Sequence, residues 1–293
     1  MDTSGLDKKA FLTCDVDYTS YISGNNLDEI SLLQNELMNY FDHNKQLGAT
    51  WFIRIDSQIE KLYNSSEYLL TEHKLFWEYL KEHGHKLGWH HHAYVSEAGV
   101  WKQNTNEDVI VEEIKKYGKI ALANGLDICR MGWGYHTNRT VKEINNLGFK
   151  LDSSAIPRPK YKWELSEKDW STTGQKPYFP SNADYRIQKE EHTNTIQVPI
   201  NTVTLELPKD TDKEVKRYIN PAYYHTYFKE CILNYDKNEN LNSLVLISHP
   251  YELIRSNEKH ELIAFDFEVF KQNIEYLKDR NFKFYTLERN NIM

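Results

Sequence analysis

Two acidic residues near the amino end of the chain have the spacing of a catalytic or metal-binding pair. Asp15 and Asp17 flank a single valine and follow the apolar run 9–14. In an extended chain, residues i and i+2 point to the same side, so both carboxylates can face one pocket. Two close carboxylates repel each other unless a cation or a proton is shared. The pair therefore indicates one metal ligand and one base, and the alternative is a solvated strand end with a capping aspartate.

Three adjacent histidines form the second candidate site. His90, His91 and His92 follow the segment 84–89, and neutral imidazole is a common ligand for zinc and similar metals. If the segment is extended, His90 and His92 share a face with their Cα atoms roughly 6.5–7 Å apart, and both can bind one ion. If it is helical, the partner of His90 is Tyr94, a poor ligand with an ordinary pKa of about 10. The alternative is one exposed and two packed histidines.

Two further segments place polar groups after apolar runs. His249 and Pro250 come after the apolar run 244–247 and Ser248, and Arg130 precedes a Gly-Trp-Gly turn at 132–134. An arginine can hold a carboxylate through two hydrogen bonds, and glycines let backbone N–H groups approach a ligand closely. Neither segment identifies a site on its own.

The elements that must position these residues alternate between strand and helix patterns. This alternation predicts an α/β fold with a parallel sheet covered by helices, either a barrel or an open sheet. Both architectures place chemistry at the carboxyl ends of strands, where the candidate residues fall. A capping-box pattern at 105–108 predicts the start of one helix. We expect strands at 9–15, 49–55, 85–89, 126–130, 149–152, 195–204, 243–248 and 282–287, and helices at 27–43, 69–82, 105–123, 138–147 and 267–277.

The composition excludes some function classes. The chain has 293 residues, of which 40% are hydrophobic, and we expect a single domain spanning 1–293. A net charge of −7 gives no basic surface for nucleic acid, and no apolar stretch approaches the roughly 18–20 residues of a membrane span. The polar amino end does not resemble a secretion signal, and three widely spaced cysteines indicate reduced thiols. We therefore expect a soluble cytoplasmic protein.

The order of these motifs resembles that of the polysaccharide deacetylase family (carbohydrate esterase family four, NodB-homology type). Residues 13–17 (TCDVD) resemble its first motif, 84–90 (GHKLGWH) its second, and 246–250 (LISHP) its last. Residues 48–53 (GATWFI) are similar to the strand after the first motif, and 130–134 (RMGWG) stand where the family has RPPYG. The resemblance spans about 11–287 and implies an irregular (β/α)7 barrel.

The resemblance also implies the catalytic roles. Asp15 corresponds to the general base, and the Arg130 side chain would orient it. The backbone N–H of Trp133 would bind the oxyanion, and His249 corresponds to the general acid. The implied reaction is metal-dependent removal of an N-acyl group, acetyl or formyl, from a carbohydrate. Alternatives are hydrolysis of another linear or cyclic amide C–N bond, or a non-catalytic carbohydrate-binding protein of the same fold.

The implied metal site departs from the family pattern. Asp17 and His90 correspond to ligands of one divalent ion, with Zn²⁺ the first candidate. The second metal histidine of the family falls four residues after the first, and here that place holds Tyr94. We expect His92 to supply the ligand; alternatively the metal keeps two protein ligands and more water, or is absent.

The missing secretion signal favours a carbohydrate precursor such as a nucleotide sugar as the substrate. The proline- and aromatic-rich region 157–193 predicts an elaborated loop. Its aromatic residues could stack on sugar faces or pack within the loop, and these residues are Trp163, Trp170, Tyr178 and Tyr185.

Overall fold

The computed structural model describes residues 8–17, 29–97, 99–163, 166–207, 210–238, 241–256 and 259–292. The chain divides into two compact units. The first unit comprises Met1–Trp51, Glu78–Lys86 and Ile200–Leu287, and the second comprises Phe52–Trp77, Leu87–Pro199 and Glu288–Met293. The expectation of a single domain stays a prediction.

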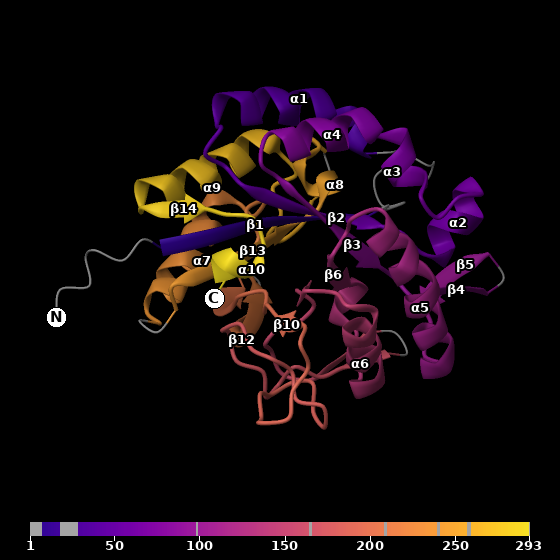
Figure 1. Ribbon diagram of the computed structural model, residues 1–293. Coiled ribbons are helices and arrows are strands. Elements are labelled where there is room, and N and C mark those ends of the chain that lie inside the picture. Colours follow the sequence, from indigo (N-terminus) through magenta and orange to yellow (C-terminus); the bar gives the residue numbers. More distant parts are fainter. Residues whose placement is uncertain are drawn as a thin grey trace. The chain divides into compact units, whose positions relative to one another are not determined.

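Strand β1 (Lys8–Val16) is the centre of the first unit. It pairs in parallel with β13 (Ser243–Ser248) and with β14 (Phe282–Phe284). The register opposes Cys14 to Ser248, so that the residues that follow them, Asp15 and His249, lie at the same edge of the sheet. Helix α9 (Phe267–Asp279) contacts β14 and α7 (His225–Asp236) (Figure 1). Tyr40 of α1 (Glu29–His43) meets Phe267 edge to face.

The second unit contains a parallel set of four short strands. Its order is β3 (Lys86–His91), β6 (Ile128–Met131), β7 (Leu151–Asp152) and β10 (Ile196–Gln197). Helices α5 (Glu107–Ala123) and α6 (Asn138–Leu147) follow β3 and β6 along the chain and contact each other (Figure 1). Parallel strands alternating with helices confirm the predicted α/β class.

Two predicted helices begin or end differently from the expectation. Asn106, not Thr105, is the N-cap of α5, because its side chain accepts from the N–H groups of Asp108 and Val109. The expected helix 69–82 is two helices, α3 (Tyr68–Glu72) and α4 (Lys74–Glu82), interrupted at His73. Residues 27 and 28 of the first predicted helix lie outside the described residues.

Other elements were not predicted. Helix α2 (Ser57–Tyr63) is capped by Asp56, whose carboxylate accepts from the N–H groups of Gln58 and Ile59. The expected strand 195–204 is divided between β10 and β11 (Thr202–Leu207), because β11 turns away to pair antiparallel with β12 (Asp210–Tyr218). Also not predicted are the hairpin β4 (Tyr94–Glu97) and β5 (Val100–Gln103), the hairpin β8 (Tyr161–Trp163) and β9 (Ser166–Lys168), and the short helices η1 (Gly132–Gly134), α8 (Pro250–Leu253) and α10 (Arg289–Ile292). The predicted strand 49–55, in contrast, is present as β2 (Ala49–Arg54).

Two expectations drawn from composition can be compared with the described residues. Cys14, Cys129 and Cys231 are all buried and free, as expected of reduced thiols. Among the helices that the structure describes, none combines the length and apolarity needed to cross a bilayer.

Candidate metal and catalytic site

The two aspartates of the first motif lie at the carboxyl end of β1. Asp15 is the penultimate residue of the strand and is buried, and Asp17 follows the strand directly. The Asp17 N–H donates to the Asp15 carbonyl at 2.8 Å, which closes a tight turn. Because the apolar side chains before Asp15 fill the core of the first unit, burial of β1 fixes the pair at this edge.

His249 reaches the same edge from β13. Its Nε2 lies 3.9 Å from Asp17 Oδ2, and its Nδ1 lies 3.1 Å from Glu252 Oε1. Burial disfavours the imidazolium, but the Glu252 carboxylate and then Asp17 and Asp15 outweigh it and raise the pKa of His249 to about 9. His249 is therefore protonated at neutral pH, as a general acid must be.

Sequence reasoning missed Glu252. Its side chain is 0% exposed, and its Oε2 accepts from the His249 N–H and from Asn220 Nδ2, each at 2.8 Å. The Oε1 atom is left to face the imidazole of His249. A glutamate three residues after the residue that caps α8 has the spacing of a capping box, and that spacing was the available signal.

The structure brings His90 and His92 together in the second unit. Both side chains are buried, and their Nε2 atoms lie 3.1 Å apart. His90 Nδ1 lies 2.9 Å from the carbonyl oxygen of Arg130 on β6, the residue that is opposite His90 in the strand register. Because a carbonyl only accepts, Nδ1 carries the proton and Nε2 carries the lone pair.

This pair of imidazoles fits a divalent metal. A histidine whose Nδ1–H donates to a backbone carbonyl has the tautomer and ring orientation of a metal ligand that binds through Nε2. Two Nε2 atoms at 3.1 Å need a proton or a cation to relieve their repulsion. Nitrogen donors of this kind suit zinc and related transition metals.

The side chain of His91 does not join the pair formed by His90 and His92. Its Nε2 lies 3.8 Å from Glu113 Oε2 of α5, and its side chain is fully buried. Burial lowers the pKa of His91 to about 4, so the ring is neutral at physiological pH. Because all three adjacent histidines are buried, the alternative of one exposed and two packed side chains is wrong.

Arg130 and Trp133 lie next to the histidine pair. The Arg130 Nε and Nη2 donate to the carbonyl and hydroxyl oxygens of Ser153, each at 2.8 Å, and its guanidinium lies 4.3 Å from the Phe52 ring centroid. Trp133 has φ of 54° and ψ of 13°, a left-handed conformation that non-glycine residues rarely adopt and that often marks functional turns. The expected roles of Arg130 toward Asp15 and of the Trp133 N–H toward an oxyanion stay predictions.

The turn that carries Trp133 is packed closely on both sides. A Cβ added at Gly132 would lie 2.3 Å from His92 Nδ1, so only glycine fits there. Trp170 is 1% exposed and donates its indole N–H to the Gly134 carbonyl at 2.7 Å. Trp170 therefore supports the turn and cannot stack on a sugar.

The other three aromatic residues of the loop, which could stack on a sugar or pack within the loop, differ in what the structure describes. Tyr178 and Tyr185 are partly exposed, and their hydroxyl groups donate to the backbone carbonyls of Tyr185 and Asp169. The side chain of Trp163 lies outside the described residues.

Comparison with known proteins shows the fold. No protein-family model and no curated protein matches the chain. Among solved structures, a protein from Mycobacterium smegmatis assigned as a polysaccharide deacetylase has a TM-score of 0.52 and 14% identity, over 99% of this chain and 96% of that one. The chain has the polysaccharide deacetylase fold. The predicted irregular (β/α)7 barrel of the α/β class is thus confirmed.

Two further similar structures have lower scores. The family 4 carbohydrate esterase from Streptomyces lividans, in complex with acetate, has a TM-score of 0.46 and 8% identity, over 98% of this chain and 97% of that one. The polysaccharide deacetylase Bc1974 from Bacillus cereus has a TM-score of 0.45 and 14% identity, over 97% and 93%.

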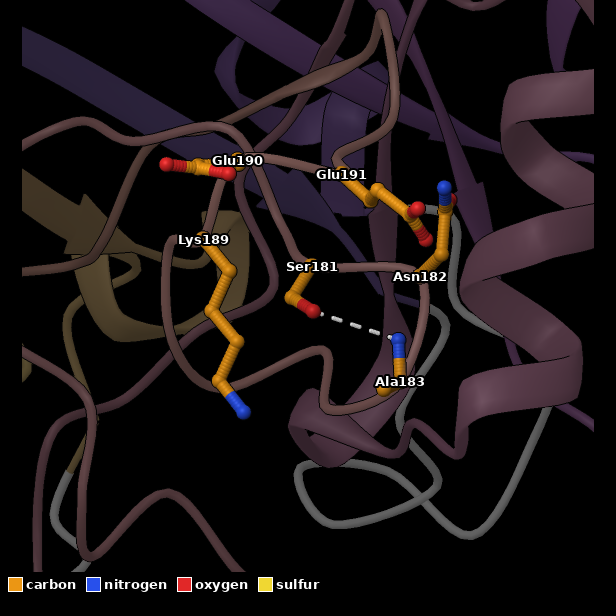
Figure 2. Close-up of a pocket in the computed structure, with 6 residues that line it drawn as sticks. All are labelled: Ser181, Asn182, Ala183, Lys189, Glu190 and Glu191. Atoms are coloured by element: carbon orange, nitrogen blue, oxygen red, sulfur yellow. Dashed lines mark hydrogen bonds between the residues drawn. The ribbon is translucent and has the colours of Figure 1, made fainter.

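The second unit of this deacetylase fold also contains a surface cavity of about 780 Å³. Figure 2 shows its lining, in which the Ala183 N–H donates to Ser181 Oγ at 3.2 Å. Its lining carries both positive and negative charge, from Lys189, Glu190 and Glu191. No predicted catalytic or metal-binding residue lines it.

Proposed function

We propose that this chain is a divergent member of the polysaccharide deacetylase family, a metal-dependent hydrolase that removes an N-acyl group from a carbohydrate. One observation carries the proposal. Two buried imidazoles point their Nε2 atoms at each other across 3.1 Å at the end of β3, in a chain with the deacetylase fold. An arrangement of this kind costs stability unless a cation or proton is bound.

The proposed metal ligands are Asp17, His90 and His92, a set of side chains that could hold one ion. Zn²⁺ is the first candidate, because two imidazoles and one carboxylate, with a fourth position open to water, form a common catalytic zinc site. The metal, when bound, would polarise the acyl carbonyl and lower the pKa of a water molecule.

The remaining predicted residues would transfer protons, orient the base and bind the oxyanion. Asp15 would accept the proton of the attacking water, and Arg130 would orient its carboxylate. His249 would donate a proton to the leaving amine, a role worth about 10²–10⁴ in rate. Its raised pKa supports this assignment, since an acid with a pKa of about 9 stays protonated at neutral pH. The Trp133 N–H would hold the oxyanion, and one such donor is worth roughly 3–4 kcal/mol.

The proposed substrate is an N-acetylated or N-formylated sugar, with nucleotide sugars as a class to test. The name of the similar protein from Mycobacterium smegmatis supports a carbohydrate. The test is elemental analysis of the purified protein, followed by acetate and formate release from a panel of N-acyl sugars and nucleotide sugars. Stoichiometric zinc with release of either acid is the expected result. A protein without any stoichiometric divalent metal would overturn the proposal and favour a non-catalytic carbohydrate-binding protein.

A further inference from the structure

The ring of Tyr94 is stacked on the imidazole of His92. Their ring centroids are 5.0 Å apart and their planes differ by 8°. The Trp133 indole stands nearly perpendicular to both rings, at 5.1 Å from each centroid and with interplanar angles of 89° and 84°. His92 therefore lies in an aromatic cluster with Tyr94, its near neighbour in sequence, and with Trp133, which is distant in sequence.

A buried ion pair fixes Tyr94 in turn. The guanidinium carbon of Arg54 lies 5.4 Å from the Tyr94 ring centroid, a distance at which a cation attracts an aromatic face. Arg54 is 1% exposed and donates from Nε to Asp56 Oδ2 and from Nη2 to Gln58 Oε1, each at 2.7 Å. Because its Nε and Nη2 both donate to side chains within the core, the guanidinium of Arg54 is a rigid support for the tyrosine ring.

The same ion pair reaches the backbone of His92. Asp56 Oδ2, which accepts from Arg54, also accepts from the His92 N–H at 3.4 Å. Asp56 Oδ1 is anchored separately by the N–H groups of Gln58 and Ile59, each at 3.0 Å. The main chain of His92 and the ring stacked on it are therefore connected to one buried carboxylate.

His92 needs such support because it lies beyond the strand. β3 ends at His91, so strand pairing fixes His90 but not His92. Gly132 permits the close approach of the His92 ring on one side, where an added Cβ would lie 2.3 Å from Nδ1. With Gly132, Trp133 and Tyr94 around the ring, its Nε2 edge is directed toward His90 Nε2.

We propose that Tyr94 is a positioning residue that holds the His92 imidazole in the orientation of a metal ligand, supported by the Arg54–Asp56 ion pair. The inference rests on the proposed function, since it takes a metal at His90 and His92. The aromatic ring of Tyr94 acts through its face, and its hydroxyl group is not required. A stacked ring restricts rotation of the imidazole before the metal arrives, so the site loses less entropy on binding.

The test measures metal affinity in three purified, metal-free variants of the full chain. Zn²⁺ affinity is determined by competition with a chromophoric chelator, and the geometry of the site is followed by the visible absorption bands of bound Co²⁺. Tyr94→Phe keeps the ring, and we expect wild-type affinity and an unchanged Co²⁺ spectrum. Tyr94→Leu removes it, and we expect Zn²⁺ binding to weaken on the order of 10-fold to 100-fold, as for other groups that orient metal ligands.

The matched control is Tyr63→Leu, which truncates another stacked tyrosine of the second unit. The ring of Tyr63 lies 3.9 Å from that of Tyr68 with an interplanar angle of 3°. We expect this variant to keep the wild-type affinity and Co²⁺ spectrum. A general loss of packing would instead weaken both leucine variants equally and would contradict the proposal.

The remaining outcomes are also decisive. Wild-type affinity with an unchanged Co²⁺ spectrum in Tyr94→Leu overturns the positioning role and leaves the proposed function standing. Weak binding by Tyr94→Phe overturns it too, because the hydroxyl group would then be the active part, and this result holds even if Tyr94→Leu does not fold. A wild-type protein that binds neither metal overturns the proposed function, and the inference with it.

Discussion

The Glu252 carboxylate lies 3.1 Å from the Nδ1 of His249 and is itself inaccessible to solvent. Its other oxygen is held by the His249 N–H and by Asn220, so the carboxylate cannot turn away from the imidazole. A fixed negative charge at this distance favours the imidazolium and raises the pKa of His249 against the effect of burial. The protonation state of His249, the candidate acid, therefore depends on the buried Glu252 carboxylate.

The first prediction follows from this pair. Glu252→Gln removes the charge, so the pKa of His249 should fall from about 9. Since a general acid is active only when protonated, the alkaline limb of kcat/KM should move to lower pH. Above the pKa, each unit of decrease reduces the protonated fraction about tenfold. Glu268→Gln, which changes an exposed glutamate of α9, is the control and should leave the alkaline limb where it is in the wild type. If the alkaline limbs of Glu252→Gln and Glu268→Gln coincide, the role of Glu252 is contradicted.

The second prediction concerns the metal. Asp17→Ala and His90→Ala each remove a proposed ligand, and we expect both variants to lose bound metal and activity together. Elemental analysis after gel filtration measures the metal, and acyl release measures the activity. His83→Ala, on the surface of the first unit, is the matched control and should keep both. Retention of stoichiometric metal in His90→Ala would remove His90 from the ligand set.

The third prediction separates metal binding from proton transfer. Asp15→Asn keeps the shape of the side chain but cannot accept a proton as a carboxylate does. We expect this variant to retain metal and to lose turnover by about 10²–10⁴. Metal content and kcat are measured on the same preparation. Full activity would exclude Asp15 as the base.

Local features of the sequence were sufficient to predict several elements. The helix α6 and the strand β13 begin and end at the predicted residues, because Gly148 terminates the former and an apolar run defines the latter. The i, i+2 spacing also predicted that His90 and His92 would share a face. Helix α7 was missed although its buried residues have helical spacing: Phe228, Cys231, Ile232 and Tyr235.

Other features depend on contacts between distant parts of the chain. The environment of His91 includes Glu113 of α5, and the environment of Glu252 includes Asn220, which is 32 residues away. The stacking of Tyr94 on His92 depends on Arg54 and on the turn at Gly132. No spacing rule relates such residues, because tertiary packing brings them together.

The fourth prediction uses the close contact between Gly132 and His92. A Cβ at position 132 would lie 2.3 Å from the imidazole, so Gly132→Ala should displace the ring and weaken metal binding. Forced overpacking of this kind costs about 1–3 kcal/mol of stability. Gly174→Ala is the control, since nothing lies within 4 Å of its added Cβ. Both variants are compared by Zn²⁺ affinity and urea unfolding, and equal behaviour would show that the turn can move without cost.

The fifth prediction concerns stability in acid and a histidine of the first unit outside the candidate site. The His85 side chain is buried, its Nδ1 accepts from the Ala49 N–H at 3.1 Å, and its ring lies 4.3 Å from that of Phe41. Burial lowers the pKa of His85 to about 4, whereas in the unfolded chain it is about 6.5. Between these two values the unfolded chain binds a proton that the folded protein does not bind.

The free energy of unfolding should therefore fall as the pH drops through this window, by up to about 1.4 kcal/mol per pH unit from this group. His85→Asn retains an acceptor for the Ala49 N–H but does not titrate, so its stability should depend less steeply on pH. Urea unfolding between about pH 7.5 and pH 4.5 measures both slopes, and the difference between them isolates His85 from the other titrating groups. Identical slopes for the wild type and His85→Asn would mean that His85 becomes protonated in the folded protein as readily as in the unfolded chain.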